Sequence, residues 1–420
     1  MQESNFRTHA DRHMEPVLLR ALADTPVVFL DGPRQSGKST LVQTLAATRH
    51  PARYLTFDDA TTLAAAHADP VGFLAGCDGP VVLDEIQRAP GMYLALKATV
   101  DRDRRPGRFL LTGSADALLL PRLADALVGR MERLTLWPLS QGERAGQREG
   151  FIDALFATGG IAQAPRHDDP ETLSRRVLAG GFPEALARHD VQRRDAWFGS
   201  YVTTLLQRDV RDLAHVEGLA DLPRLLALVA ARNGRLHNAA EVARSLGMPL
   251  TTIRRYLTLL EATFLVHSIP AWSANLGKRL VRAPKLVVVD SGLAAHLQGL
   301  DIDRLRALPS LFGPQLEAFV AMELRRQLGW ALTRARLYHW RSHDGLEVDL
   351  VVEDAAGRIA GVEVKASASV SSADFRSLRY LQGALGERFV RGVVLYGGAD
   401  AVDFGPGLHA QPVASVWRTL

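Results

Sequence analysis

The chain has 420 residues, of which 47% are hydrophobic and 23% charged, a composition that excludes a disordered or fibrous protein. Its length exceeds what one core normally organises, so we expect two to four domains. The net charge of +4 supports a polyanionic partner only weakly, and the absence of a run of about 18 uncharged apolar residues predicts no membrane span. A single cysteine, Cys77, excludes an intramolecular disulfide framework and, with an N-terminus that lacks an apolar secretory core, predicts a cytoplasmic protein.

The first motif along the chain is a phosphate-binding loop of the pattern G-x-x-x-x-G-K-[ST]. It lies between the apolar run 27–30 and an apolar-periodic stretch after residue 40, which is the strand–loop–helix context that the motif needs. Its backbone N–H groups and the following helix N-terminus favour phosphate. We therefore expect ATP and Mg²⁺ to bind here, with Lys38 at the β- and γ-phosphates and Ser39 on the metal. The loop comprises Gly32, Pro33, Arg34, Gln35, Ser36, Gly37, Lys38, Ser39 and Thr40.

Residues 53–57 and 80–86 read as two further strands, and alternating strand and helix patterns predict a parallel α/β sheet. The second of these strands ends in Asp84-Glu85, about 50 residues after the loop. Two acids at this strand end place Asp84 near the Mg²⁺ and Glu85 beside the attacking water as general base. The pair predicts hydrolysis of the triphosphate as well as binding.

Two more residues have a functional and a structural interpretation. Ser114 ends the apolar run 108–114, where it either senses the γ-phosphate or caps the next helix. Arg130 either reaches the nucleotide of a neighbouring subunit and stabilises transition-state charge there, or is a solvated residue at a helix end.

At this point the sequence resembles the prokaryotic AAA-type (AAA_14) ATPases that carry a C-terminal domain of the DUF4143 type. The resemblance spans nearly the whole chain and rests on the strings GPRQSGKSTL, YLTFDD, VVLDEIQRAP, LLTGSADALL, LVGRMERLTLWPLS and GGFPEAL. It implies an AAA+ fold, ATP binding by Lys38, Ser39, Asp84 and Glu85, a sensor role for Ser114 and a finger role for Arg130. Because such fingers act between subunits, the resemblance also implies a homo-oligomer, for which a ring is one candidate arrangement.

Residues 140–215 are rich in Ala, Leu and Arg and read as helices, broken by a turn at Gly180-Gly181-Phe182. In the family this string lies near the lid of the ATPase. A second sensor is expected among Arg175, Arg176 and Arg208, and the spacing selects none of them.

Residues 222–262 read as a helix-turn-helix, in which residues 239–246 form one helix and residues 250–261 a second. The second helix has an apolar face and a face that suits a DNA groove, and residues 264–290 read as a basic wing. Packing without DNA contact is the alternative, since winged helices also serve as packing modules. The expected DNA-binding residues are Thr252, Arg254, Arg255, Lys278 and Arg279, and Arg282 and Lys285 add to the basic charge of the wing.

The last third changes character and reads as helix, three strands, helix and strand, the order of a small α/β nuclease core. Asp349 ends one strand, and Glu363 and Lys365 lie two residues apart on the next, so they share a face. Glu317 on the preceding helix is expected to complete an acidic cluster, and Glu323 is its rival six residues along the same helix. Carboxylates of this kind bind Mg²⁺, which activates water for phosphodiester cleavage, while Lys365 orients that water.

This arrangement resembles the PD-(D/E)xK nuclease superfamily and is similar in spacing to archaeal Holliday-junction resolvases. The resemblance implies an active site of Glu317, Asp349, Glu363 and Lys365, with Val348 where the superfamily name has proline. The alternative is a short D…ExK match that arises by chance, or a fold that has lost catalysis.

The sequence as a whole predicts an α/β multidomain protein. The expected domains are an AAA+ P-loop ATPase core at 1–140, a helical lid at 141–220, a winged helix-turn-helix at 221–300 and a restriction-endonuclease-like α/β domain at 301–420. We expect ATP hydrolysis coupled to Mg²⁺-dependent DNA cleavage, selective for DNA structure rather than sequence. The alternatives are an ATP-driven regulatory or defence switch whose C-terminal domains do not cleave, and a transcription regulator that reads sequence through Arg254 and Arg255.

Overall fold

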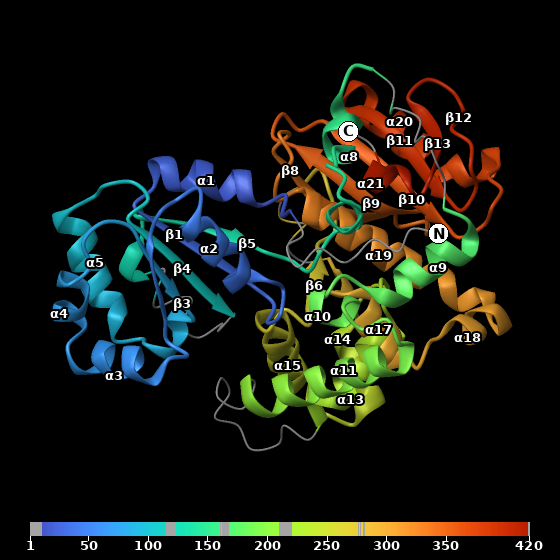
Figure 1. Cartoon of the computed structure of the whole chain (residues 1–420). Coiled ribbons are helices and arrows are strands. Elements are labelled where there is room, and N and C mark those ends of the chain that lie inside the picture. Colours follow the sequence, from blue (N-terminus) through green and yellow to red (C-terminus); the bar gives the residue numbers. More distant parts are fainter. Residues whose placement is uncertain are drawn as a thin grey trace.

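The structure is a computed structural model that describes residues 11–114, 123, 125–159, 161, 168–209, 221–275, 277, 279 and 282–418. An N-terminal sheet domain lies at one side of the molecule (Figure 1). The C-terminal sheet forms the upper part of the other side in this view, and most helices of the middle region lie below it. None of the helices in the described ranges is long and apolar enough to cross a membrane.

The N-terminal domain is built on a five-stranded parallel sheet, as the sequence predicts. Its order is β2-β3-β4-β1-β5, so β1, which leads into the phosphate-binding loop, lies between β4 and β5. The strands are β1 (Val27–Gly32), β2 (Arg53–Thr56), β3 (Val81–Asp84), β4 (Phe109–Ser114) and β5 (Met131–Thr135). Because all five run in one direction, the carboxyl ends of β1, β3 and β4 meet at one edge of the sheet.

Helices cover both faces of this sheet, which the alternation of side chains along β1 makes necessary. Val28 and Leu30 face a core with α1 (Glu15–Asp24) and α2 (Lys38–Ala47). Val27 and Phe29 face a second core with α3 (Ala60–Ala68), α4 (Pro70–Ala75) and α5 (Met92–Arg102).

The middle region is mainly helical. It contains α7 (Gln141–Ala145), α8 (Phe151–Phe156), α9 (Pro170–Ala179), α10 (Pro183–Leu186), α11 (Val191–Thr204), α13 (Leu222–Ala231), α17 (Ser291–Gln298) and α18 (Ile302–Ala307). The expected helix-turn-helix is α14 (Ala239–Leu246) followed by α15 (Leu250–Ala262), with Gly247 at φ +68° ending the first helix.

The expected wing strands are β6 (Val266–Ile269) and β7 (Lys285–Val288), which pair antiparallel. The segment between them is joined to the C-terminal sheet, because Ala271 bridges to His339 and the Trp272 N–H donates to the His339 carbonyl at 2.6 Å. The wing is therefore a docked hairpin in this structure.

The C-terminal domain holds a six-stranded mixed sheet in the order β12-β13-β11-β10-β9-β8. The strands are β8 (Ala335–Arg341), β9 (Glu347–Asp354), β10 (Ile359–Lys365), β11 (Phe389–Tyr396), β12 (Val402–Asp403) and β13 (Leu408–Pro412). The long helix α19 (Phe312–Gln327) covers one face and α20 (Arg376–Leu385) the other, while the short α21 (Ser415–Arg418) packs beside α19.

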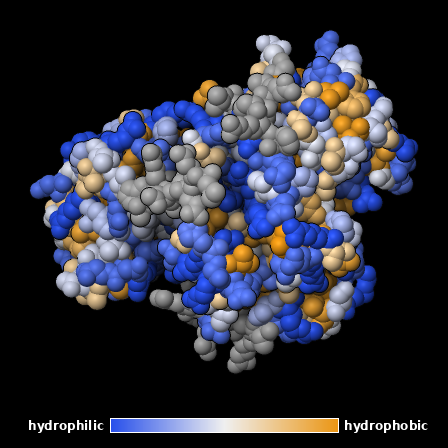
Figure 2. Space-filling view, turned by 45° about the vertical axis from the view of Figure 1, so that its right-hand side comes forward, coloured by the Kyte–Doolittle hydropathy of each residue, from blue (hydrophilic) through white to orange (hydrophobic). Residues whose placement is uncertain are grey.

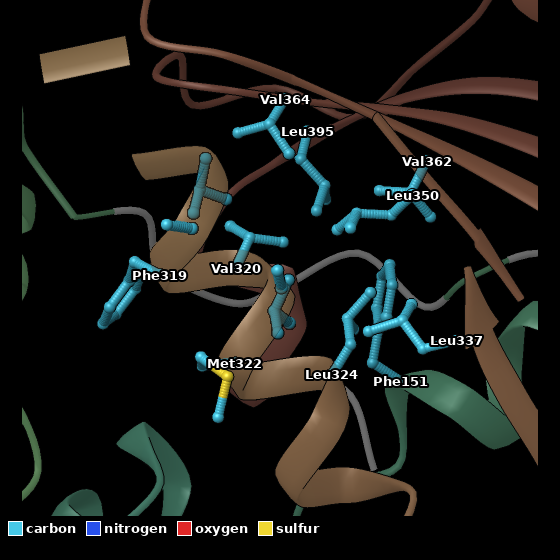
Figure 3. Close-up of a cluster of buried hydrophobic side chains, with 14 of the residues drawn as sticks. Phe151, Phe319, Val320, Met322, Leu324, Leu337, Leu350, Val362, Val364 and Leu395 are labelled. Atoms are coloured by element: carbon cyan, nitrogen blue, oxygen red, sulfur yellow. The ribbon is translucent and has the colours of Figure 1, made fainter. Parts of the chain in front are cut away.

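The core beneath α19 is apolar throughout. Figure 3 shows Val362, Val364 and Leu395 of the sheet pointing toward Val320 and Leu324 of the helix. Outside these cores, Figure 2 shows hydrophilic residues over most of one face of the molecule, with apolar residues in small groups. Most large apolar side chains are therefore buried in the cores, and this face carries mainly polar residues.

Candidate nucleotide site and acidic cluster

The phosphate-binding loop has the backbone that its glycines permit. Gly32 has φ +142° and lies so close to Leu136 that a Cβ there would be 2.2 Å from the Leu136 carbonyl oxygen. Gly37, at φ +93°, directly precedes α2, and the Ser36 side chain between them is fully buried. The loop therefore presents its N–H groups and the helix N-terminus at the carboxyl edge of the sheet.

Lys38 is buried in this loop, and its Nζ donates to the carbonyl oxygens of Gly32 at 2.9 Å and Pro33 at 2.8 Å. Burial lowers the pKa of Lys38 to about 8, so its ammonium is still charged at pH 7. Both of these acceptors are uncharged carbonyl oxygens, and the ammonium keeps its charge for pairing with phosphate.

Asp84 is the centre of a hydrogen-bonded group that includes the predicted metal ligand Ser39. The Ser39 hydroxyl donates to Asp84 Oδ1 at 3.1 Å, the Tyr54 hydroxyl donates to Oδ2 at 2.6 Å, and Thr112 also donates to Oδ1. Hydroxyl and carboxylate oxygens are the donors that Mg²⁺ prefers, so Ser39 and Asp84 fit an ion carried by ATP. Tyr54 and Thr112 were not predicted as site residues, because no local sequence pattern marks them as hydrogen-bond partners of Asp84.

Glu85 follows directly in the left-handed region, at φ +58°, where its N–H donates to the Thr112 hydroxyl at 3.2 Å. Its carboxylate accepts from the Ser114 hydroxyl at 3.3 Å and from the Gln87 amide, and that amide also contacts Ser114 Oγ at 3.2 Å. Ser114 thus holds the expected general base. The helix cap that was its alternative role involves residues outside the described ranges.

Arg130 lies at the opposite edge of the same sheet, directly before β5. Its Nε pairs with Asp101 Oδ1 at 2.6 Å, and its Nη1 donates to the Val128 carbonyl. The length of a strand, roughly 17 Å, separates it from the loop of its own chain. A finger role for Arg130 is therefore open only toward a neighbouring copy.

Helix α11 separates two cavities. One face lines a cavity of about 350 Å³ beside Arg34 and Gln35 of the loop, and Tyr201 on this face donates its hydroxyl to the Arg34 carbonyl at 3.4 Å. Another face of the helix lines a cavity of about 520 Å³ that Arg175 and Arg176 also line. These two second-sensor candidates pair with Glu171 and Asp168, respectively. The side chain of Arg208, the third candidate, lies outside the described residues.

The residues expected to bind DNA fall into two groups. Arg254 and Arg255 are exposed on α15, beside a half-buried Thr252, and Ile253 is fully buried on the other face. Arg279 is turned inward, with Nη2 at 2.9 Å from Glu353 Oε1 and its guanidinium over the Trp272 ring. Arg279 therefore has an intramolecular ion-pair partner, and its contact with DNA stays a prediction. Lys278 lies outside the described residues.

The predicted acidic residues come together at the ends of β9 and β10. The two strands pair antiparallel with Val362 opposite Leu350, which brings Glu363 beside Asp349, and Asp349 Oδ2 accepts from the Val364 N–H at 2.9 Å. Lys365 Nζ lies 3.5 Å from Glu363 Oε2, and α19 supplies Glu317 from above.

Glu323, the rival of Glu317, has another role. It is fully buried, accepts from the Gln141 N–H at 2.9 Å and pairs with Arg326 at 2.6 Å. These contacts join α19 to α7, because residues 317 and 323 project from different sides of one helix.

An unexpected cation completes the cluster. Lys285, at the start of β7, is 2% exposed, and its Nζ lies 2.7 Å from Glu317 Oε1, 2.7 Å from Glu347 Oε1 and 3.7 Å from Asp349 Oδ1. In the sequence this lysine belongs to the basic wing, where its charge predicted contact with phosphate. One feature of the sequence did indicate that Lys285 is buried: it directly precedes an apolar run and is the first residue of the strand β7.

Crowded carboxylates change the acidity of the cluster. Burial, followed by the charge of Asp349, raises the pKa of Glu317 to about 7 and that of Glu363 to about 9. Among the described residues, no group of three or more His, Cys, Asp and Glu side chains is arranged to hold a metal ion. The ligand types fit Mg²⁺, but the arrangement does not, because the ammonium of Lys285 lies among them.

Comparison with known proteins gives three family matches that follow one another along the chain. An AAA domain model matches residues 24–145, the domain of unknown function DUF8612 matches 170–304, and the domain of unknown function DUF4143 matches 312–416. Among solved structures, a Walker-type ATPase of Pyrococcus abyssi has a TM-score of 0.46 at 14% identity, covering 70% of this chain and 99% of its own. The RuvB Holliday junction branch migration motor of Thermotoga maritima has a TM-score of 0.30 at 15% identity, covering 70% and 93%.

The similarity to curated proteins extends over almost the full length. An uncharacterized protein of Haemophilus influenzae is 26% identical over 285 residues, covering 65% of this chain and 62% of its own. The uncharacterized proteins Rv2008c of Mycobacterium tuberculosis and Mb2031c of Mycobacterium bovis are each 34% identical over 409 residues, covering 96% of this chain and 83% of theirs. The chain therefore belongs to the family of Rv2008c, with an AAA_14 ATPase domain followed by DUF8612 and DUF4143 domains.

Proposed function

We propose that this protein couples ATP hydrolysis to the cleavage of DNA. In the ATPase domain Lys38 binds the phosphates, Ser39 and Asp84 hold the Mg²⁺ of the nucleotide, and Glu85 orients and deprotonates the attacking water. Ser114 and Gln87 contact Glu85 and set its position. These roles account for the hydrolase half of the proposal.

One observation carries the nuclease half. Glu317, Asp349, Glu363 and Lys365 are spread over 49 residues and three elements, and they meet at one end of the C-terminal sheet. If the D…ExK pattern were a chance match, nothing would lead us to expect a glutamate of a separate helix, Glu317, at the same place. Mg²⁺ would supply an activated water and charge stabilisation for phosphodiester cleavage only in a form of the site in which the Lys285 ammonium no longer lies among these carboxylates.

DNA and further copies of the chain are the proposed partners. Arg254 and Arg255 are exposed at the amino half of α15, where a helix of this kind contacts phosphates or base edges. We expect selectivity for DNA structure, with branched DNA as one candidate. Arg130 points to a homo-oligomer, because it lies too far from the nucleotide site of its own chain.

A second candidate function is an ATP-driven switch without cleavage. The ion pairs of Lys285 within the acidic cluster favour it, and so does the Arg279–Glu353 pair, since both tie the segments around β7 to the C-terminal sheet. In that function the two C-terminal domains are interaction modules.

The test incubates the protein with Mg²⁺, ATP and one of three DNAs: duplex, single strand or four-way junction. We expect Glu363→Ala to abolish cleavage while it retains ATPase activity, and Lys38→Ala to lose ATPase activity. Glu387→Ala, at an exposed position, is the matched control. The variant Lys285→Met removes the ammonium from the acidic cluster. If neither the wild type nor this variant cuts any of the DNAs, and if none of the three DNAs changes the ATPase rate, the DNA-processing proposal fails.

A further inference from the structure

We propose that Lys285 is a tethered cation that closes the acidic site, and that a divalent cation binds the same carboxylates only after this lysine has left. The inference rests on the proposed function in one respect, since it treats Glu317, Asp349 and Glu363 as ligands for a divalent ion. It adds the control of that site by another part of the chain.

The position of Lys285 is what a closing cation requires. Its ammonium has three N–H donors and lies within 4 Å of three carboxylates, two of them at 2.7 Å. The carboxylates come from α19 and β9, and their oxygens would otherwise repel one another in a poorly solvated place. With 2% of its side chain exposed, Lys285 takes the place that an ion would need.

The lysine and the carboxylates belong to different family domains. Lys285 falls within the DUF8612 match at 170–304, and every carboxylate it contacts falls within the DUF4143 match at 312–416. A displacement of β7 from α19 and β9 therefore breaks all three ion pairs at once, and it also opens the part of the core that Val287 and Val289 share with α19.

The chain also uses lysine very sparingly. Only five of its 50 basic residues are lysines, and the other four are Lys38, Lys97, Lys278 and Lys365. An ammonium is a compact point charge that imitates an ion among converging carboxylates, whereas the planar guanidinium of arginine spreads its charge over a fork. Lysine therefore suits position 285 better than arginine, which occupies most of the other basic positions in the chain.

Removing this charge changes the competition for the site. Without Lys285 the cluster keeps its carboxylates and loses the cation that offsets them, so its attraction for a divalent ion rises. ATP binding is the available source of a domain movement, because it acts on the loop that contacts α11 of the DUF8612 region through Tyr201.

The first experiment measures metal binding itself. Titration calorimetry with Mn²⁺, without nucleotide, compares the wild type with Lys285→Met and with the double variant Lys285→Met/Asp349→Asn. We expect Lys285→Met to bind Mn²⁺ about tenfold more tightly than the wild type, and the double variant to lose the gain. Lys97→Met, on α5 of the ATPase domain, is the control. A folded Lys285→Met that binds no more Mn²⁺ than the wild type overturns the proposal.

The second experiment uses the wild type and does not depend on a variant that folds. Acetylation of the few lysines, followed by mass spectrometry, compares Lys285 with Lys97. We expect Lys285 to react about tenfold more slowly without ligand and to lose this protection with a non-hydrolysable ATP analogue. Equal reactivity of the two lysines without ligand contradicts closure, and protection that the analogue leaves unchanged contradicts release by ATP.

The two proposals fail in different ways. If Lys285→Met gains Mn²⁺ affinity and cuts none of the DNAs, the cation site and its closure stand and the nuclease function falls. If the wild type cleaves DNA while Lys285 stays protected throughout the reaction, the nuclease function stands and the closure falls.

Discussion

At the scale of single residues, the ATP site depends on Asp84, whose two carboxylate oxygens accept from three different hydroxyls. These hydroxyls fix the carboxylate at the edge of the sheet in a single orientation. In the acidic cluster, Glu317 and Glu347 both pair with one ammonium, that of Lys285. The first site is therefore set within its own domain, whereas the second depends on a neighbouring one.

A titratable residue away from both sites offers a test of the packing between domains. His267 of β6 is partly buried beside the Trp137 ring, and burial, with the nearby charge of Arg325, lowers its pKa to about 3. The unfolded chain binds a proton below about pH 6.5, where the folded protein still does not. The contribution of His267 to stability is therefore complete above pH 6.5 and falls as the pH drops toward 3.

We expect His267→Gln to lose less stability than the wild type between pH 7 and pH 4, by at most about 1.4 kcal/mol per pH unit. Denaturant unfolding at several pH values measures the difference, and His343→Gln, at a fully exposed residue, is the control. A difference between variant and wild type that does not change with pH contradicts this account of His267.

At the scale of elements, the turn between α9 and α10 is a tightly constrained connection in the middle region. Gly180 has φ +70°, and a Cβ there would be 2.1 Å from Asp290 Oδ1. Asp290 accepts from the Gly181 N–H at 2.6 Å and also caps α17 by accepting from the Leu293 N–H. One buried carboxylate thus joins the turn to a helix more than 100 residues away.

Gly180→Ala is expected to destabilise the protein by roughly 2–4 kcal/mol, because it adds both a clash and an unfavourable φ. Gly91→Ala, at a position with φ −60° and open space around the Cβ, is the matched control and should be nearly neutral. Thermal unfolding of the two variants makes the comparison. Equal melting temperatures would mean that the turn relaxes freely.

The same scale explains what could be predicted from the sequence. The phosphate-binding loop is one continuous string, and Asp84-Glu85 directly ends an apolar strand, so local patterns were enough for both. The pairing of Glu363 with Asp349 follows from strand alternation and a short connection. Lys285 and Tyr54 act through contacts between elements, and a lone lysine or tyrosine on a short strand carries no mark of its partner. The ion pair of Arg279 with Glu353 could not be predicted for the same reason, because the two residues lie on segments that are far apart in the sequence.

At the scale of the whole molecule, the position of Arg130 gives a prediction about assembly. Arg130→Ala keeps its own phosphate-binding loop, and Lys38→Ala keeps its arginine. If the arginine acts on a neighbouring copy, an equal mixture of the two inactive variants recovers part of the wild-type ATPase rate. A coupled assay of the mixture and of each variant alone measures this, with Arg104→Ala as the control at an exposed arginine. No recovery would remove Arg130 as a finger.

The largest apolar core crosses the boundaries that the sequence suggested for the domains. It combines Trp137 from the end of the ATPase region, Phe264 next to β6, Leu316 of α19 and Trp417 near the C-terminus. A fragment cut at residue 300 would expose this core on both pieces. The three regions therefore depend on one another for the burial of this core, and a region that is replaced singly leaves the other two with apolar side chains that lack a packing partner.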